Sequence, residues 1–98
     1  MNSTFADKVR GIVAKIPRGE VRTYFAVAKL AGNVKAARAV GNILHQNFDP
    51  KIPCHRVVRA DGKIGGFNRG LIEKIRKLKS EGVKISGDAI AQIPRRKK

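Results

Sequence analysis

The chain has 98 residues, which favours one small domain over two, because domains commonly hold about 100 to 150 residues. It carries 22 Lys and Arg residues against 7 Asp and Glu, a net charge of +15 that points to a polyanionic partner. No stretch approaches the roughly 20 apolar residues of a membrane-spanning helix, and charges interrupt the N-terminal segment where a signal peptide would need an apolar run. We therefore expect a soluble protein with no membrane partner.

Cys54 is the one cysteine of the chain, so it cannot form an internal disulfide. With only 2 histidines the chain also lacks a standard structural zinc set, and we expect no metal. Two interpretations of Cys54 remain open at this point. A lone cysteine is most often a small buried hydrophobic residue, and less often a nucleophile.

Hydrophobic periodicity predicts three helices in the first half of the chain. Apolar residues at helical spacing predict the first over residues 5–16, with Thr4 and Asp7 at its start. Thr23 is predicted to cap a second helix over residues 24–31, which Gly32 ends, and Asn33 to cap a third over residues 34–45. The last two resemble a helix-turn-helix, although short helix pairs are also common in plain bundles.

The predicted third helix has a small apolar face, which we expect to pack inward, and a polar face that either contacts DNA or is simply solvated. The small and apolar positions are Ala37, Val40, Gly41 and Leu44. The polar positions are Lys35, Arg38, Asn42 and His45.

The second half is predicted to hold a loop over residues 47–53, a short β-hairpin and a last helix. Val57 and Val58 with the Asp61-Gly62 turn predict a hairpin that returns through residues 63–64. The last helix is predicted over residues 71–81 with Leu71, Ile72, Ile75 and Leu78 inward, and Gly82 ends it. We expect a mostly α single domain over residues 1–98, winged helix-turn-helix-like with a short β-hairpin, and a flexible basic tail from about residue 85.

Cys54 stands between Pro53 and His55, where the predicted loop meets the strand rather than on the apolar stripe of a helix. This position favours the nucleophile. A free thiol has a pKa of about 8.5, so only a few per cent is thiolate at neutral pH. A neighbouring imidazole and nearby cations would raise that fraction.

The string Pro53-Cys54-His55-Arg56-Val57 resembles the active-site signature of the O6-alkylguanine-DNA alkyltransferases, also called methylated-DNA–protein-cysteine methyltransferases. Further pieces of the family's pattern occur in the family's order. The resemblance covers roughly residues 5 to 83 and is to the family's catalytic C-terminal domain. The further pieces are Pro17-Arg18-Gly19, the runs at residues 30–33 and 35–41, Asn47, and Gly65-Gly66 followed by an aromatic residue.

The resemblance implies DNA repair by direct reversal of damage, in which an alkyl group passes irreversibly from O6-alkylguanine to Cys54. Each molecule would react once, and no cofactor is implied. The family's mechanism implies that His55 takes the thiol proton through a water, that Glu81 orients His55, and that Asn47 braces the turn.

The resemblance also implies double-stranded DNA as the partner, bound in the minor groove with the alkylated base flipped out. Arg38 would fill the space that the nucleotide leaves, and Tyr24 would help to rotate it. We expect a cytoplasmic, nucleoid-associated monomer, or a nuclear one in a eukaryote. The implied DNA contacts are Arg38, Tyr24, Lys35, Ala37, Asn42 and Arg56. The implied substrate pocket is formed by Phe67, Asn68, Val57 and Gly66.

The sequence departs from the family's pattern in three ways. Larger members carry an N-terminal domain before this region. Phe67 stands where the family usually has a tyrosine, and Arg69 stands at a position that is often glycine.

Two alternative functions remain. Alkyltransferase-like proteins bind alkylated guanine without reacting and carry another residue, often tryptophan, in place of Cys54. A small basic architectural DNA-binding protein would explain the charge but not the ordered motifs.

Overall fold

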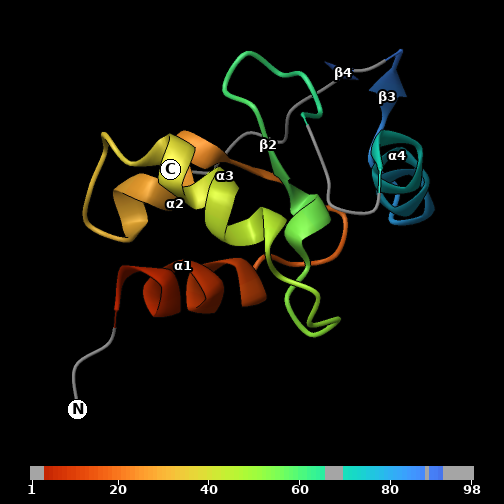
Figure 1. Cartoon of the computed structure of the whole chain (residues 1–98). Helices are drawn as coiled ribbons and strands as arrows, with labels where there is room; N and C mark the ends of the chain where they lie inside the picture. The colour runs from red at the N-terminus through yellow and green to blue at the C-terminus, as the bar shows by residue number, and fades with distance from the viewer. Residues whose placement is uncertain (1–3, 66–69, 88, 92–98) are drawn as a thin grey trace.

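The computed structural model describes residues 4–65, 70–87 and 89–91. Its helices are α1 (Phe5–Ala14), α2 (Tyr24–Leu30), α3 (Ala37–His45) and α4 (Leu71–Ser80), with a 3-10 turn, η1 (Cys54–Arg56). The strands are short: β1 (Arg22–Thr23), β2 (Val57–Val58), β3 (Ile85–Ser86) and β4 (Ala89–Ile90). Figure 1 shows α1, α2 and α3 grouped on one side of β2, and α4 with β3 on the other. The predicted mostly α fold is confirmed.

Side-chain caps start the first two helices where the sequence predicted them. The Thr4 hydroxyl accepts a hydrogen bond from the Asp7 amide at 3.0 Å, and the Asp7 carboxylate accepts one from the Thr4 amide at 3.2 Å. The Thr23 hydroxyl accepts a bond from the Ala26 amide at 3.0 Å. Each cap pairs an amide that the helix cannot pair itself, an effect worth about 1 kcal/mol.

Helix α3 begins three residues later than predicted, at Ala37 instead of residue 34. The Asn33 side chain accepts a hydrogen bond from the Lys35 amide at 3.1 Å, and the Ala36 amide donates to the Asn33 carbonyl at 3.1 Å. The Asn33 side chain thus closes a turn instead of capping a helix. Consequently Lys35 precedes α3 and does not lie on its polar face.

Strand β2 pairs in parallel with β1, with Arg22 opposite Val57 and Thr23 opposite Val58. The predicted pairing of β2 with residues 63–64 is not formed; the chain does turn back, but only the Arg59 amide, just after β2, donates to the Lys63 carbonyl, at 2.9 Å. Both residues of β2 are fully buried, as is typical of a strand that is covered on both faces. The Asp61-Gly62 turn does form, with the Gly62 amide donating to the Arg59 carbonyl at 3.0 Å.

The antiparallel pair lies further along the chain, where β3 pairs with β4. Lys63 bridges to Ala89, and the Ile90 amide donates to the Gly62 carbonyl at 2.8 Å. Ile90 is buried, so the segment that was predicted as the start of a flexible tail is anchored as far as β4. The basic residues at 95–98 lie outside the described residues.

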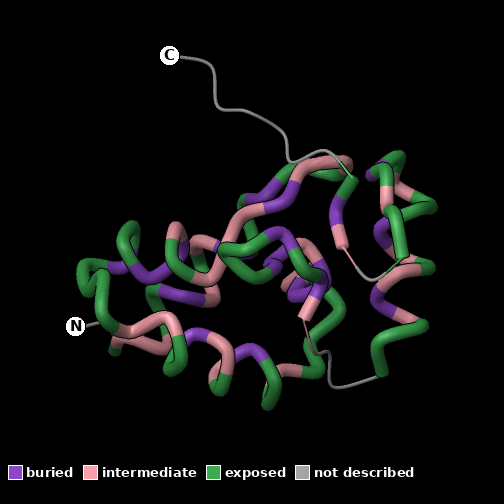
Figure 2. Tube along the Cα trace, turned by 90° about the horizontal axis from the view of Figure 1, so that it is seen from above, coloured by how far each residue is buried: buried purple, intermediate pink, exposed green. Residues whose placement is uncertain are grey.

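The core is made of two hydrophobic clusters that meet at β2. Val57 belongs to the cluster of α1, α2 and α3, and Val58 to the cluster of α4 and β4, because successive strand residues point to opposite faces. Along each helix buried positions alternate with exposed ones (Figure 2). The segment that follows Cys54 is therefore held from both sides. The first cluster is Val9, Val13, Ile16, Val27, Ala28, Ala31, Val40, Leu44, Cys54 and Val57, and the second is Val21, Val58, Ile64, Leu78, Val83 and Ile90.

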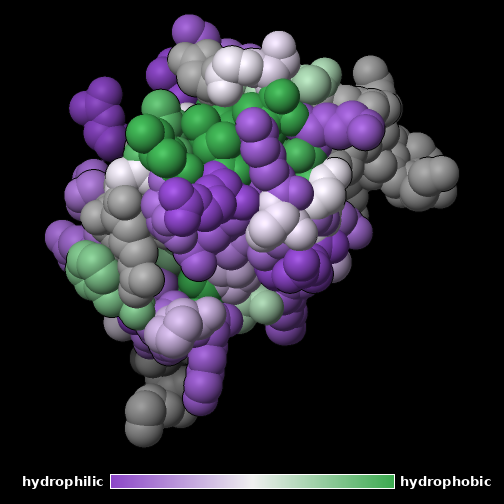
Figure 3. All heavy atoms as spheres, turned by 90° about the vertical axis from the view of Figure 1, so that its right-hand side faces the viewer, coloured by the Kyte–Doolittle hydropathy of each residue, from purple (hydrophilic) through white to green (hydrophobic). Residues whose placement is uncertain are grey.

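Helix α4 packs only part of its predicted apolar positions inward, since Ile75 and Leu78 contact the second cluster. Leu78 is buried as expected, but Leu71 and Ile72 are 42% and 76% exposed, and Lys74 is fully buried. On the side of the molecule where α4 lies, Figure 3 shows a hydrophobic region bordered by hydrophilic side chains. Within the described ranges, no helix has the length and apolar character needed to cross a membrane.

Candidate active site

Cys54 begins η1, in the predicted place between the loop over residues 47–53 and β2. Its amide donates to the Ile52 carbonyl at 2.8 Å, and the Arg56 amide donates to the Pro53 carbonyl at 2.9 Å. These two bonds fix the direction of the Cys54 side chain. The residue is 7% exposed and packs at the edge of the first cluster.

The Asn47 side chain holds the sulfur of Cys54. Its Nδ2 donates to Cys54 Sγ at 3.1 Å and also contacts the Asp49 carbonyl at 3.3 Å. Asn47 follows directly on the end of α3, whose C-cap is Gln46. A donor aimed at sulfur favours the thiolate over the thiol.

Burial raises the pKa of the Cys54 thiol above its ordinary value. The Asn47 hydrogen bond and the positive charge of Lys74 act in the opposite direction. Near neutral pH Cys54 is therefore mainly the thiol, and its reactivity depends on removal of the proton.

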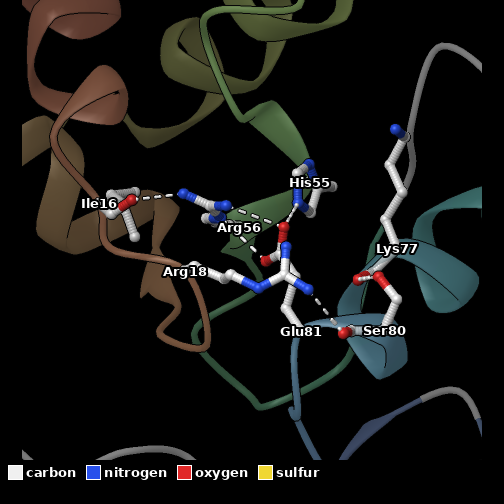
Figure 4. A network of polar contacts seen from close by, with 7 residues as sticks. All are labelled: Ile16, Arg18, His55, Arg56, Lys77, Ser80 and Glu81. Atoms are coloured by element: carbon white, nitrogen blue, oxygen red, sulfur yellow. Dashed lines mark hydrogen bonds and ion pairs between the residues drawn. The ribbon is translucent and has the colours of Figure 1, made fainter.

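His55 and Glu81 are joined as the sequence reading expected. His55 Nε2 lies 2.8 Å from Glu81 Oε2, and the two side chains are 11% and 7% exposed. The contact connects η1 to the C-cap of α4 (Figure 4). Burial lowers the pKa of His55, which is opposed by its bond to Glu81, so the imidazole is neutral near pH 7 and able to accept a proton.

Arg56 makes interior contacts instead of facing open surface. Its Nε and Nη2 donate to the two oxygens of Glu81 at 2.9 and 2.8 Å, and its Nη1 donates to the Ile16 carbonyl at 2.7 Å. Figure 4 shows the guanidinium between these two partners. The prediction that Arg56 contacts DNA finds no support in this position, because its donors already hold α1 and α4 together.

Burial alone would raise the pKa of Glu81, but the hydrogen bonds from Arg56 and His55 outweigh it and lower the pKa to about 2. Glu81 is therefore ionised at all ordinary pH values. A permanent carboxylate on one nitrogen of His55 fixes the orientation of the ring and favours its protonated form once a proton arrives.

Lys74 is a component of the site that the sequence analysis missed. Its Nζ donates to the carbonyls of Val57 and Ile64 at 2.8 and 2.7 Å, and lies 3.5 Å from the Tyr24 hydroxyl. Burial lowers the pKa of Lys74 to about 8, although Cys54 opposes the shift. No signal in the sequence distinguished Lys74 from Lys77 and Lys79 of the same helix.

A groove of about 670 Å³ runs between α3 and the turn that follows β2. Arg38 and Asn42 line it from α3, and Tyr24 lines it from α2. The predicted DNA contacts Tyr24, Ala37, Arg38 and Asn42 thus share one groove, whereas Lys35 and Arg56 do not line it. The complete lining is Tyr24, Phe25, Ala37, Arg38, Gly41, Asn42, Arg59, Ala60 and Asp61.

The predicted substrate pocket is only partly described. Gly66, Phe67 and Asn68, and the departure at Arg69, lie outside the described residues. Val57 is fully buried in the core, where its carbonyl accepts the bond from Lys74. In the part of the chain that the structure describes, no group of three or more His, Cys, Asp or Glu side chains could hold a metal ion.

The fold and the site define a small helical domain in which a buried cysteine, hydrogen-bonded by an asparagine, lies in the same domain as a groove lined by arginine and aromatic side chains. Residues 4–83 match the family described as 6-O-methylguanine DNA methyltransferase, DNA binding domain. The chain belongs to this family.

Two relatives and one solved structure illustrate the similarity. A methylated-DNA–protein-cysteine methyltransferase of Methanosarcina acetivorans is 47% identical over 81 residues, which are 80% of this chain and 51% of that protein. A DNA base-flipping protein of Escherichia coli is 41% identical over 93 residues, 94% of this chain and 72% of that protein. A crystal structure of S. pombe ATL in complex with DNA has a TM-score of 0.81 at 31% identity, covering 96% of this chain and 94% of that one.

The chain spans only part of several longer relatives. It covers 27%, 45% and 51% of the lengths of three curated relatives.

Proposed function

We propose that the chain repairs DNA by transferring the alkyl group of O6-alkylguanine to the sulfur of Cys54, once per molecule. The observation that carries the proposal is the hydrogen bond from Asn47 to Cys54 Sγ, with the neighbouring His55 held by Glu81. A structural cysteine needs no such donor, whereas a nucleophile that must become a thiolate benefits from it.

The reaction balances without a cofactor. The thiol proton leaves through a water to His55, whose conjugate acid Glu81 stabilises. The sulfur then forms a bond to the alkyl carbon while the carbon–O6 bond breaks, its electron pair passing to guanine, which takes up one proton. The products are a thioether on Cys54 and unmodified guanine.

DNA binding would place the damaged nucleotide near the sulfur. The alkyl carbon cannot reach a buried thiol while its base is stacked, so the nucleotide must rotate out of the duplex. Arg38 is exposed on α3 and lines the groove beside Tyr24, positions suited to filling the emptied stack and to turning the nucleotide. We also propose that the chain corresponds to the catalytic C-terminal domain of the longer relatives.

Intact-protein mass spectrometry tests the transfer. The chain is incubated with a duplex that carries one O6-methylguanine, and we expect its mass to rise by one methyl group, located on Cys54, with one lesion repaired per molecule. Cys54→Ser is the control and should bind the duplex without a mass change. Repair of many lesions by one molecule would exclude the mechanism.

A second candidate function is binding of the lesion without transfer. It is considered because the chain is also similar to a protein of E. coli named DNA base-flipping protein and to S. pombe ATL, and these two matches span most of both proteins. It predicts tight binding of the O6-methylguanine duplex with no gain in mass, so the same experiment separates the two functions. The Asn47 donor on the sulfur favours transfer.

A further inference from the structure

The wall of the groove opposite α3 carries its own cation, Arg59. Arg59 follows β2 directly, and its guanidinium pairs with Asp61 at 3.0 Å. Both side chains are about half exposed, at 57% and 47%, and both line the groove across from Arg38. The alkyl-transfer reaction itself assigns no role to Arg59 or Asp61.

The position of Arg59 is set by its neighbours. A Cβ on Gly65 would lie 3.2 Å from Arg59 Cγ and 3.6 Å from a ring carbon of Tyr24, so the glycine leaves room for both side chains. Gly65 also has a φ of +78°, which favours glycine. The backbone bond from the Arg59 amide to the Lys63 carbonyl, at 2.9 Å, closes the turn. The Arg59 stem is therefore packed, while its charged end remains in the groove.

The pair with Asp61 is weak enough to be exchanged. Exposed ion pairs contribute little to stability, because water and salt screen them. A carboxylate in a groove that faces DNA repels phosphate unless a cation neutralises it. A phosphate that enters between the walls would therefore compete with Asp61 for the guanidinium and would gain a charge-assisted bond.

We propose that Arg59 binds a phosphate of the DNA backbone that lies in this groove, and that Asp61 holds Arg59 in place until DNA replaces it. The inference rests on the proposed function for its partner, which is DNA, but not on transfer to Cys54. Arg59 would then hold the backbone on the wall opposite α3, from which Arg38 would enter the emptied stack.

Binding of an unmodified duplex by variants in a Cys54→Ser background tests the inference. We expect Arg59→Ala to weaken binding by roughly three- to tenfold at low salt, and to make the log–log salt dependence less steep by about 0.9, the value for one phosphate. Arg76→Ala is the matched control, because Arg76 forms a similar pair with Glu73, 3.9 Å apart and exposed, on α4. Arg59→Met, which keeps the stem, should behave like Arg59→Ala, and Arg59→Lys should bind nearly as well as the parent.

The role of Asp61 is read from a double-mutant cycle. Asp61→Asn should strengthen binding, and the gain should shrink when Arg59 is also replaced by Ala, because the two residues act on one phosphate. The inference is overturned if Arg59→Ala has no greater effect than Arg76→Ala, if Arg59→Met binds like the parent, or if the Asp61→Asn gain is equal in both backgrounds. Absence of a mass change in the parent chain would overturn the transfer proposal alone, since these affinities do not depend on it.

Discussion

The side-chain nitrogen of Asn47 lies 3.1 Å from the sulfur of Cys54, seven residues further along the chain. Because Asn47 follows the end of α3 and Cys54 precedes β2, the bond links α3, which lines the groove, to the reactive sulfur. Its contribution to reactivity can be measured in the absence of DNA.

Asn47→Ala should raise the pKa of the Cys54 thiol, because the thiolate loses its donor while burial continues to disfavour charge. We expect alkyl transfer at neutral pH to slow by about tenfold. The rate of Cys54 modification by iodoacetamide as a function of pH measures the shift directly. Asn42→Ala, on the exposed face of α3, is the control, and an unchanged profile in Asn47→Ala would contradict the assignment.

Glu81→Gln should slow transfer by at least about tenfold, because the imidazolium of His55 loses its carboxylate. It should also destabilise the fold, since Arg56 keeps a nearly buried charge without its partner, a change that can cost about 3 kcal/mol. Urea unfolding and single-turnover rates measure the two effects. Glu73→Gln should change neither, and a Glu81→Gln variant that reacts at the parent rate would remove Glu81 from the mechanism.

Acid should destabilise the parent chain in a defined window. The pKa of Glu81 is about 2 in the folded chain against an ordinary 4.5, so its contribution is complete above pH 4.5 and is lost as the pH falls towards 2. The lowered pKa of His55 acts in the same direction below its ordinary value of 6.5, because the folded chain binds that proton less readily. Thermal unfolding across this range should show a steeper loss in the parent than in Glu81→Gln, and parallel curves would argue against the coupling.

Lys74→Met should raise the pKa of the Cys54 thiol, because the buried ammonium favours the thiolate. The variant leaves the carbonyls of Val57 and Ile64 without this donor, at about 1 kcal/mol or more each, but avoids the cost of burying a charge. The pKa of Lys74 is about 8 in the folded chain against an ordinary 10.5. Between these two pH values the unfolded chain keeps a proton on Lys74 that the folded chain has released. Lys74 therefore makes stability rise with pH from about 8 to 10.5, and Lys74→Met should lack that rise. Lys79→Met, on the exposed face of α4, should retain both the rise and the thiol titration; equal behaviour of the two variants would refute the role of Lys74.

Arg38→Ala should reduce repair of a duplex far more than reaction with free O6-alkylguanine base, which needs no flipping. If Arg38 is only one phosphate contact among the 22 basic residues, saturating DNA should restore the rate. Single-turnover rates at saturating duplex and with free base distinguish the two cases. Arg76→Ala serves as the control for loss of one exposed charge, and equal losses on both substrates would exclude the role of Arg38 in flipping.

Local signals in the sequence were sufficient for most of the helical fold. Helical periodicity together with Thr4, Thr23 and Gly82 located both ends of three helices to within a residue or two. The start of α3 was misplaced because an asparagine can either cap a helix or close a turn, and only the surrounding fold decides between them.

Long-range contacts could not be predicted in the same way. The partner of β2 lies 35 positions earlier in the chain, at β1, and nothing in Val57 or Val58 specifies it. Of the site, the pair of His55 with Glu81 followed from the family resemblance and agrees with the geometry. Lys74 was missed because a lysine in a helix is normally solvated, and its burial depends on carbonyls that only the folded chain brings together.

The contacts of Arg56 bear on how the domain comes apart. One guanidinium binds the Ile16 carbonyl after α1 and the Glu81 carboxylate after α4, so it crosses the boundary between the two hydrophobic clusters. Without such a link the two clusters could unfold separately, and the second cluster, around α4 and β4, would then unfold first. Because Arg56 binds a group beside each core, unfolding of either core alone would break some of its hydrogen bonds and leave its charge poorly paired. The chain should accordingly unfold in a single cooperative transition, and η1, which carries Cys54, should keep its structure until the whole domain unfolds.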